Sequence, residues 1–191
     1  KRQLVTNSGI EIQLRHIANS AGALGLPETH FDLVRPGISL YGVSPSPDLG
    51  TAKQLGLKTT MVMSAVVANV KRVLAGSPVS YSHQYVAPAD TQLALIPLGY
   101  SNGIPRIASN RGPILVGGRK LTVSGRVCMD QFVVDIGDLP VNAGDEIILF
   151  GEEAMGHPTV EEWANICGTI PHEIFTRIGP LVHREYINVP F

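Results

Sequence analysis

The chain has 191 residues, of which 44% are hydrophobic, so it is long enough for one globular domain or for one domain and a piece of another. Its formal net charge of −1 argues against nucleic acid as a main partner, because neutralising phosphates requires a basic surface. No apolar run approaches the ~20 residues that span a bilayer, and the start, KRQLVTNSGI, lacks the long apolar core of a signal peptide.

The first 50 residues are typical of the end of an α/β domain. The stretch IQLRHIANSAGAL changes from apolar residues to small ones. The stretch FDLVRPGISLYG predicts a short strand that is broken at Pro36 and Gly37, since proline cannot continue a helix and glycine permits unusual dihedral angles. The loop GVSPSPDLGT is rich in Pro, Gly and Ser and indicates a domain boundary near residue 50.

After this boundary the pattern predicts strands. The stretch LKTTMVMSAVVANVKRVL is dense in β-branched residues and partly alternates between Met61 and Val73. Further strands are predicted in TQLALIPLGY, ILVGG, KLTVSGRV, QFVVDIG and DEIILFG, with turn residues between them. Short strands at this spacing favour an antiparallel β-barrel or sandwich.

Two helices are predicted late in the chain. In TVEEWANICG, Thr159 and Glu162 have the spacing of a capping box, and Gly168 is a suitable stop.

In TIPHEIFTRIGP, Thr169 is expected to cap a helix with Pro171 in its first turn, ended by Gly179-Pro180. The tail LVHREYINVPF is predicted to form a final strand. The fold class is therefore mainly β, with two late helices, preceded by the last part of an α/β domain.

Cysteine and histidine spacing disfavours a disulfide framework and a metal site. Cys128 and Cys167 lie in unlike contexts without CxxC spacing, and the six histidines show no HxH or HExxH pairing. A reducing, cytoplasmic setting fits this usage.

Polar residues interrupt the packing pattern in the clusters RHIANSA, RPGISLYG, PVSYSHQY, LGYSNGIPR and GRVCMDQFVVDI. Each cluster by itself also fits an ordinary turn. PVSYSHQY is either a hydroxyl-rich hairpin tip or a loop that presents a proton-transfer group on a rigid scaffold. Burying Asp130 without a partner would cost several kcal/mol, so this carboxylate is expected to be paired or to lie in a cleft.

The order of these clusters, followed by GTIPHEIFTRIG, resembles the carboxy-terminal half of bacterial alanine racemases. The resemblance extends over nearly the whole chain, and GRVCMDQ and the VSY and GY loops make it specific. It implies a cytoplasmic, homodimeric isomerase that uses pyridoxal phosphate (PLP) to interconvert L- and D-alanine, the latter for peptidoglycan precursors. Residues 1–50 then match the incomplete end of the family's PLP-binding α/β barrel, and residues 51–191 match its β-rich carboxy-terminal domain.

The resemblance implies cofactor contacts in the first 50 residues. Ser20 matches a serine that contacts the PLP phosphate, and Gly37 and Ile38 match backbone contacts to the same group. Arg35 matches an arginine that faces the pyridine nitrogen, and His16 a histidine that hydrogen-bonds this arginine. Because a guanidinium stays protonated, it donates to the ring nitrogen without protonating it. The cofactor is then a weaker electron sink.

The resemblance also assigns Tyr81 as one of two acid/base groups. The tyrosine serves one face of the α-carbon in the partner subunit's site, and a lysine serves the other face. Because a phenol has a pKa of ~10, local cations or hydrogen-bond donors must lower it toward the working pH. Tyr100 and Met129 match residues that line the substrate entrance and the carboxylate site from the opposite subunit. Tyr85 is interpreted as a packing residue.

Three departures from the family pattern affect the expected activity. His172 stands where a tyrosine usually serves as a second phosphate ligand, and Asn102 replaces the aspartate of GYxDG. Lys71 in VVANVKRV lacks the family's motif, a lysine followed by Ala-Asn-Ala-Tyr-Gly. The PLP lysine is therefore expected to be absent, and the chain alone is expected to be inactive without a first-half chain.

Two other interpretations remain open. The chain could be a β-domain binding or assembly module without catalysis, although HIANSAGALGL and DLVRPGISLYGV are apolar enough to need a partner. It could also belong to a related PLP-dependent amino-acid racemase or decarboxylase, but the decarboxylases lack GRVCMDQ and the VSY loop.

Overall fold

The computed structural model describes residue 9 and residues 11–187. The chain divides into two compact units, Lys1–Thr60 and Met61–Phe191. Among the described residues, no helix is both long enough and apolar enough to cross a membrane.

The first unit contains two neighbouring extended segments that run in the same direction. A parallel bridge pairs His16 with Leu33, and the backbone N–H of Arg35 donates to the carbonyl of Ala18 at 2.8 Å. The strand predicted before Pro36 is thus reduced to a single bridge. Helix α2 (Ser20–Gly25) follows the first segment directly.

Short turns of 3-10 helix make up much of the rest of the first unit, at Pro27–Thr29, Ile38–Tyr41 and Pro47–Leu49. Gly42 ends the second of them at φ 82°. A Cβ atom at this glycine would lie 2.2 Å from the carbonyl oxygen of Lys58, so the close backbone approach requires glycine.

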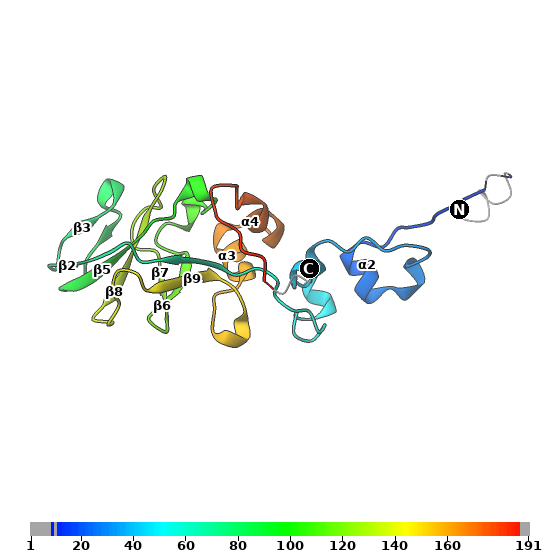
Figure 1. The fold of residues 1–191 in the computed structure, drawn as a ribbon, viewed down its shortest axis with the longest axis horizontal. Coiled ribbons are helices and arrows are strands. Elements are labelled where there is room, and N and C mark those ends of the chain that lie inside the picture. The colour runs from blue at the N-terminus through cyan, green and yellow to red at the C-terminus, as the bar shows by residue number, and fades with distance from the viewer. Residues whose placement is uncertain (1–8, 10, 188–191) are drawn as a thin grey trace. The chain divides into compact units, whose positions relative to one another are not determined.

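The second unit is built from antiparallel sheets, as the sequence predicts (Figure 1). The four-stranded sheet has the order β1-β9-β6-β7, and the three-stranded sheet has the order β2-β5-β8. A third sheet pairs β3 with β4. The strands are β1 Met63–Val66, β2 Asn69–Val73, β3 Pro78–Val79, β4 Tyr85–Val86, β5 Thr91–Ile96, β6 Pro113–Val116, β7 Arg119–Thr122, β8 Phe132–Gly137 and β9 Glu146–Phe150.

The core of this unit follows from the alternation of its strands. Every second residue of β8 is buried, beginning with Phe132, and β6 alternates in the same way. The two larger sheets are linked by an antiparallel bridge between Val123 and Val134. The largest side chains that are almost wholly buried include Trp163, Phe132, Ile96, Ile114 and Ile147.

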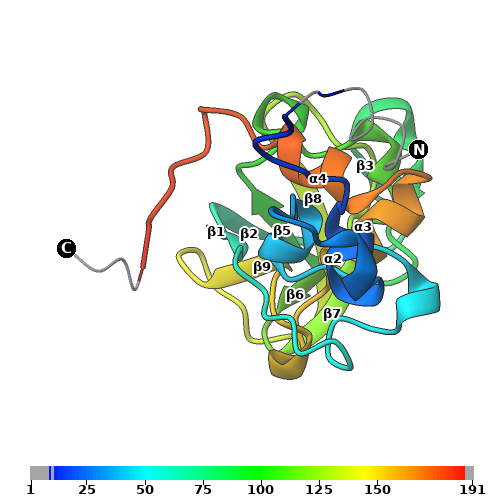
Figure 2. The same cartoon turned by 90° about the vertical axis from the view of Figure 1, so that its right-hand side faces the viewer.

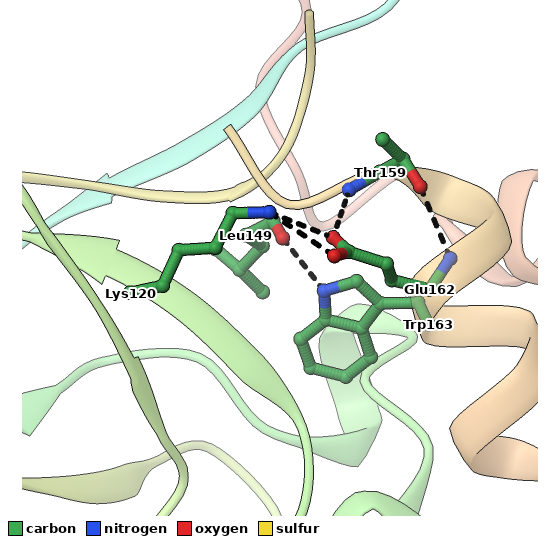
Figure 3. A network of polar contacts seen from close by, with 5 residues as sticks. All are labelled: Lys120, Leu149, Thr159, Glu162 and Trp163. Carbon is green, nitrogen blue, oxygen red and sulfur yellow. Dashed lines mark hydrogen bonds and ion pairs between the residues drawn. The ribbon is translucent and has the colours of Figure 1, made fainter. Parts of the chain in front are cut away.

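Helix α3 (Val160–Cys167) begins and ends as its sequence predicts. Thr159 and Glu162 form a reciprocal capping box, and Gly168 ends the helix at φ 66°. Lys120 of β7 forms an ion pair with Glu162 at 3.0 Å, and Figure 3 shows its ammonium group facing the carboxylate that completes the capping box. Trp163 donates from its indole N–H to the carbonyl of Leu149 at 2.6 Å, which ties the helix to β9.

Helix α4 (Pro171–Arg177) lies beside α3 (Figure 1), but its predicted ends are wrong. Ile170, not Thr169, occupies the N-cap position, and the Thr169 hydroxyl donates instead to the carboxylate of Glu173. The helix ends at Arg177, before Gly179, because Ile178 is already extended, with ψ 99°.

The final strand predicted in LVHREYINVPF is also wrong for its described part. Residues 181–187 form no strand, and Figure 2 shows the segment after α4 as an extended stretch without an arrow. Two of its large apolar side chains are strongly exposed, Leu181 at 70% and Ile187 at 74%. The remaining residues, 188–191, lie outside the described part of the chain.

Candidate active site

The segment PVSYSHQY forms a small hairpin. Strand β3 pairs with β4 through two residue pairs, Pro78 with Val86 and Val79 with Tyr85. Tyr81 lies at the tip of this hairpin, in a turn of 3-10 helix, and its side chain is 72% exposed. PVSYSHQY is therefore a hairpin, and its tip is the loop that presents Tyr81.

The segment LGYSNGIPR meets GRVCMDQ through the backbone. The N–H of Tyr100 donates to the carbonyl of Cys128 at 3.0 Å, and the N–H of Ser101 donates to that of Met129 at 2.9 Å. A Cβ atom at Gly99 would lie 2.2 Å from the Met129 carbonyl oxygen. Glycine is thus required here by close approach of two chain segments.

These segments surround a cavity of about 370 Å³ that contains three of the predicted site residues, Tyr81, Tyr100 and Met129. All three side chains are exposed. The complete lining is Tyr81, Tyr100, Arg106, Arg126, Val127, Cys128, Met129, Asp130 and Gln131.

The cavity holds more positive than negative charge, since Arg106 and Arg126 face one acidic residue, Asp130. Asp130 accepts a hydrogen bond from the Ser101 hydroxyl at 2.6 Å and is exposed, so it is both paired and placed in a cleft, as expected. The Nε atom of Arg126 is buried and has no hydrogen-bond partner in the described part of the chain. A buried donor of this kind favours an anionic ligand.

Tyr81 and Tyr85 differ sharply in environment. Tyr85 is partly buried and donates its hydroxyl hydrogen to Asp135 at 2.6 Å. Burial and the adjacent carboxylate raise the pKa of Tyr85 to about 12. A phenol that holds its proton this firmly is unsuited to acid/base work near neutral pH, which agrees with the interpretation of Tyr85 as a packing residue.

In the first unit, Ser20 and Gly37 lie in direct contact. The backbone N–H of Gly37 donates to the Ser20 Oγ at 2.8 Å, and Ser20 is only 6% exposed. Because this oxygen accepts the bond, its own hydrogen remains available to a ligand. A Cβ atom at Gly37 would meet nothing within 4 Å, so open space lies beside this backbone, and Ile38 follows directly. The group fits an anion of phosphate type.

Arg35 and His16 lie on the two extended segments that carry these residues. The Arg35 guanidinium donates to the carbonyl of Ile17 at 3.3 Å, beside His16. Both residues are exposed. The structure therefore places them on neighbouring segments, whereas their predicted mutual hydrogen bond stays a prediction.

His172 lies in the first turn of α4 and is exposed. It belongs to the second unit, whereas Ser20 and Gly37 belong to the first.

The departure at Asn102 has a local explanation, because its side-chain oxygen accepts from the backbone N–H of Gly99 at 2.9 Å. The Asn102 side chain thus stabilises the turn in which it lies.

Sequence reasoning assigned no role to Arg106 or Arg126, although both belong to segments that it singled out. Their presence in the same motifs as Tyr100 and Met129 was the available signal.

In the described residues, no three His, Cys, Asp or Glu side chains gather to hold a metal ion. Cys128 and Cys167 are free thiols, and burial raises the pKa of Cys167.

Comparison with known proteins places the chain in one family. Residues 60–186 match the model of the alanine racemase C-terminal domain, and residues 2–45 match that of the alanine racemase N-terminal domain. The alanine racemase of Streptomyces coelicolor is 54% identical over 180 residues, covering 94% of this chain and 46% of the relative.

Solved structures give the same result. The chain superposes on alanine racemase from D-cycloserine-producing Streptomyces lavendulae with a TM-score of 0.95 and 52% identity, covering 99% of this chain and 50% of that one. Alanine racemase from Bartonella henselae with covalently bound pyridoxal phosphate gives a TM-score of 0.83 at 35% identity, covering 97% of this chain and 50% of that one. The chain thus spans about half the length of the relatives it matches.

Proposed function

The chain belongs to the alanine racemase family, and we propose that it is the carboxy-terminal part of a PLP-dependent enzyme that interconverts L- and D-alanine. Residues 1–50 are the end of the PLP-binding barrel, and residues 51–191 are the β-rich domain. The observation that carries the proposal is the cavity that gathers Tyr81, Tyr100 and Met129 from three separate segments.

Tyr81 is the proton-transfer group for one face of the α-carbon. Racemisation requires removal of the α-proton from one face and its return on the other, so a second group must serve the opposite face. The exposed position of Tyr81 at a hairpin tip supports action in the site of a partner subunit of a homodimer. Arg106 and Arg126 line the same cavity.

The cavity binds the substrate carboxylate. The free Nε donor of Arg126 supports this role, because a buried guanidinium hydrogen gains most from an anionic acceptor. Tyr100 and Met129 line the entrance beside it.

The residues of the first unit would hold the cofactor. Ser20, Gly37 and Ile38 would bind its phosphate, and the contact between Ser20 and Gly37 supports this assignment. His172 is a further phosphate donor, since imidazole can replace a phenol in that role. When bound, PLP supplies the electron sink that makes the α-proton of an amino acid acidic. Arg35, supported by His16, would limit that sink by donating to the ring nitrogen without protonating it.

The chain alone is inactive, because none of its lysines has the context of the family's PLP lysine. Activity requires a first-half chain that carries this lysine, within a cytoplasmic homodimer that supplies D-alanine for peptidoglycan precursors. The charged and polar lining of the cavity favours this enzyme over a non-catalytic module.

The test is complementation. The chain is coexpressed with the first half of the Streptomyces coelicolor relative, and D-alanine formation from L-alanine is measured with added PLP. We expect turnover only in the complemented sample. Replacing Tyr81→Phe should lower it by about 10²–10⁴-fold, whereas Tyr186→Phe, the matched loss of a hydroxyl at a 78% exposed position, should leave it unchanged.

Three outcomes would contradict parts of this proposal. Sustained turnover by the chain alone would show that the lysine is not missing. Equal activity of the Tyr81→Phe and Tyr186→Phe enzymes would remove Tyr81 from the reaction. A well-behaved monomer in light scattering that binds neither PLP nor the first-half chain would favour the non-catalytic module.

A further inference from the structure

The hairpin that carries Tyr81 is too small to fix its own tip. Only two residue pairs join β3 to β4, and isolated two-stranded hairpins are marginal in water. Three non-glycine residues of the tip have positive φ, namely Ser80 at 62°, Ser82 at 60° and His83 at 48°. Such a backbone persists only where surrounding structure holds it.

Side chains from distant parts of the second unit supply that support. The Ser80 hydroxyl donates to the carbonyl of Arg126 at 3.0 Å, across 46 positions of sequence. The side-chain amide of Asn110 donates to the carbonyl of Gln84 at 3.1 Å. These two bonds hold the tip on either side of Tyr81.

The third bond holds the residue pair that closes the tip, Val79 with Tyr85, and its acceptor has the most partners. Tyr85, the first residue of β4, donates to Asp135 of β8 at 2.6 Å, across 50 positions. The Asp135 carboxylate also accepts from the Thr91 hydroxyl and from the backbone N–H of Gly137. Its own backbone N–H donates to the Ser124 hydroxyl at 2.9 Å. Asp135 therefore keeps a donor to its carboxylate and a backbone bond in addition to any single hydroxyl partner.

Strand β8 also connects this acceptor with the proposed substrate site. It begins at Phe132, directly after Met129, Asp130 and Gln131, which line the cavity. Asp135 thus ties the hairpin that presents Tyr81 to the strand that continues from the cavity residues Met129, Asp130 and Gln131. A shift of one relative to the other would change the distance between Tyr81 and the substrate.

We propose that Asp135, acting through Tyr85, is a positioning residue that fixes the Tyr81 phenol relative to the cavity. The inference rests on the proposed function of Tyr81, but the position of the phenol can be measured without turnover. Asp135 and Tyr85 touch neither substrate nor cofactor in this scheme. Their effect is on where Tyr81 lies and how firmly it is held.

The first experiment is carbon-13 NMR of the whole chain labelled at the tyrosine ring, with the Tyr81 signal assigned by Tyr81→Phe. The variants are Tyr85→Phe, which removes the donor, and Asp135→Asn, which keeps a neutral acceptor and guards against misfolding. The controls are Tyr186→Phe and Thr91→Val. The second control removes a hydroxyl bonded to the same carboxylate but outside the hairpin.

In Tyr85→Phe we expect the Tyr81 signal to broaden or split, and amide exchange of residues 80–84 to accelerate about tenfold or more, as loss of a bond to a charged acceptor predicts. Asp135→Asn should produce a smaller change of the same kind. Both controls should leave the Tyr81 signal unchanged. A Tyr81 signal and loop exchange in Tyr85→Phe equal to those in Thr91→Val would overturn the proposal.

The second experiment uses the complemented enzyme. Tyr85→Phe should lower kcat by about tenfold and leave KM for alanine within about twofold, because substrate contacts are untouched. A purely stabilising network would lower only the amount of folded enzyme, so kcat calculated per folded enzyme would stay unchanged. That result, or equal effects on kcat and KM, would contradict positioning. If the complemented wild type is inactive, the proposed function fails, and the NMR result still decides whether Asp135 positions Tyr81.

Discussion

At the scale of single residues, the two tyrosines of PVSYSHQY show how neighbouring positions receive opposite chemistry. Tyr81 is exposed beside a cationic cavity, and Tyr85 is held by a carboxylate. The folded state raises the Tyr85 pKa from 10.0 to about 12. The protonated phenol is therefore the form that the folded state prefers.

The pKa of Tyr85 predicts a pH dependence of stability. Because its folded pKa is raised, its contribution is complete below about pH 10 and is lost as the pH rises toward about 12. Urea unfolding of wild type and Tyr85→Phe between about pH 9 and 12 measures this loss. This range extends to both sides of ~10, the pKa of a free phenol. The difference in unfolding free energy between the two proteins should shrink through this window. A constant difference would contradict the assigned bond.

Gly99 permits a second prediction at this scale. The Gly99→Ala variant would place a Cβ 2.2 Å from the backbone carbonyl of Met129, which no rotamer change can relieve. We expect a loss of about 1–3 kcal/mol in unfolding free energy, together with weaker substrate binding in the complemented enzyme. The control is Gly179→Ala, where the nearest atom lies 4.0 Å away. Equal stability of the two variants in urea would show that the two segments can separate freely.

At the scale of elements, helix α3 combines a cap, an ion pair and a buried indole at one sheet. The Thr159 cap satisfies helix N–H groups within the chain's own turn, whereas Lys120 reaches Glu162 from β7 through an exposed pair. We expect Thr159→Ala to cost about 1 kcal/mol of unfolding free energy. Lys120→Met should cost less, since exposed ion pairs contribute about 0–1 kcal/mol. Urea unfolding checks the order, and a reversed order would mean that the sheet contact, not the cap, secures the helix.

The same elements show what the sequence could predict. The start and stop of α3 were predictable because a capping box and a terminal glycine act within a few residues. The start of α4 was not, because Thr169 satisfies Glu173 rather than a backbone N–H. Residues 181–187 have strand composition, but a strand also requires a partner edge, and local sequence does not encode that edge.

The candidate site also contains both residues that the sequence could predict and contacts that it could not. Tyr81, Tyr100 and Met129 were predictable from motifs, because each lies in a short distinctive segment. The bond between Tyr85 and Asp135 was not, since the two residues lie 50 positions apart and nothing in their local patterns pairs them. Only the folded arrangement of β4 against β8 reveals it.

At the scale of the whole molecule, the two units differ in how much structure each contains. The second unit has all nine named strands of the described chain, whereas the described helices of the first are six residues or shorter. Large apolar side chains of the first unit are exposed, including Ile17 at 61% and Leu40 at 63%. Under the proposed function, the rest of the barrel covers this surface.

This difference predicts unequal protection from hydrogen exchange. In the isolated chain, amides of β5 should exchange only through global opening, because this strand lies between β2 and β8 in its sheet. Amides of residues 11–60 should exchange within about tenfold of an unstructured peptide, since few buried apolar contacts oppose local opening. Adding the first half of the Streptomyces coelicolor relative should slow exchange in residues 11–60 and leave β5 unchanged. Strong protection of both units in the isolated chain would instead show that the first unit is stable without the rest of a barrel.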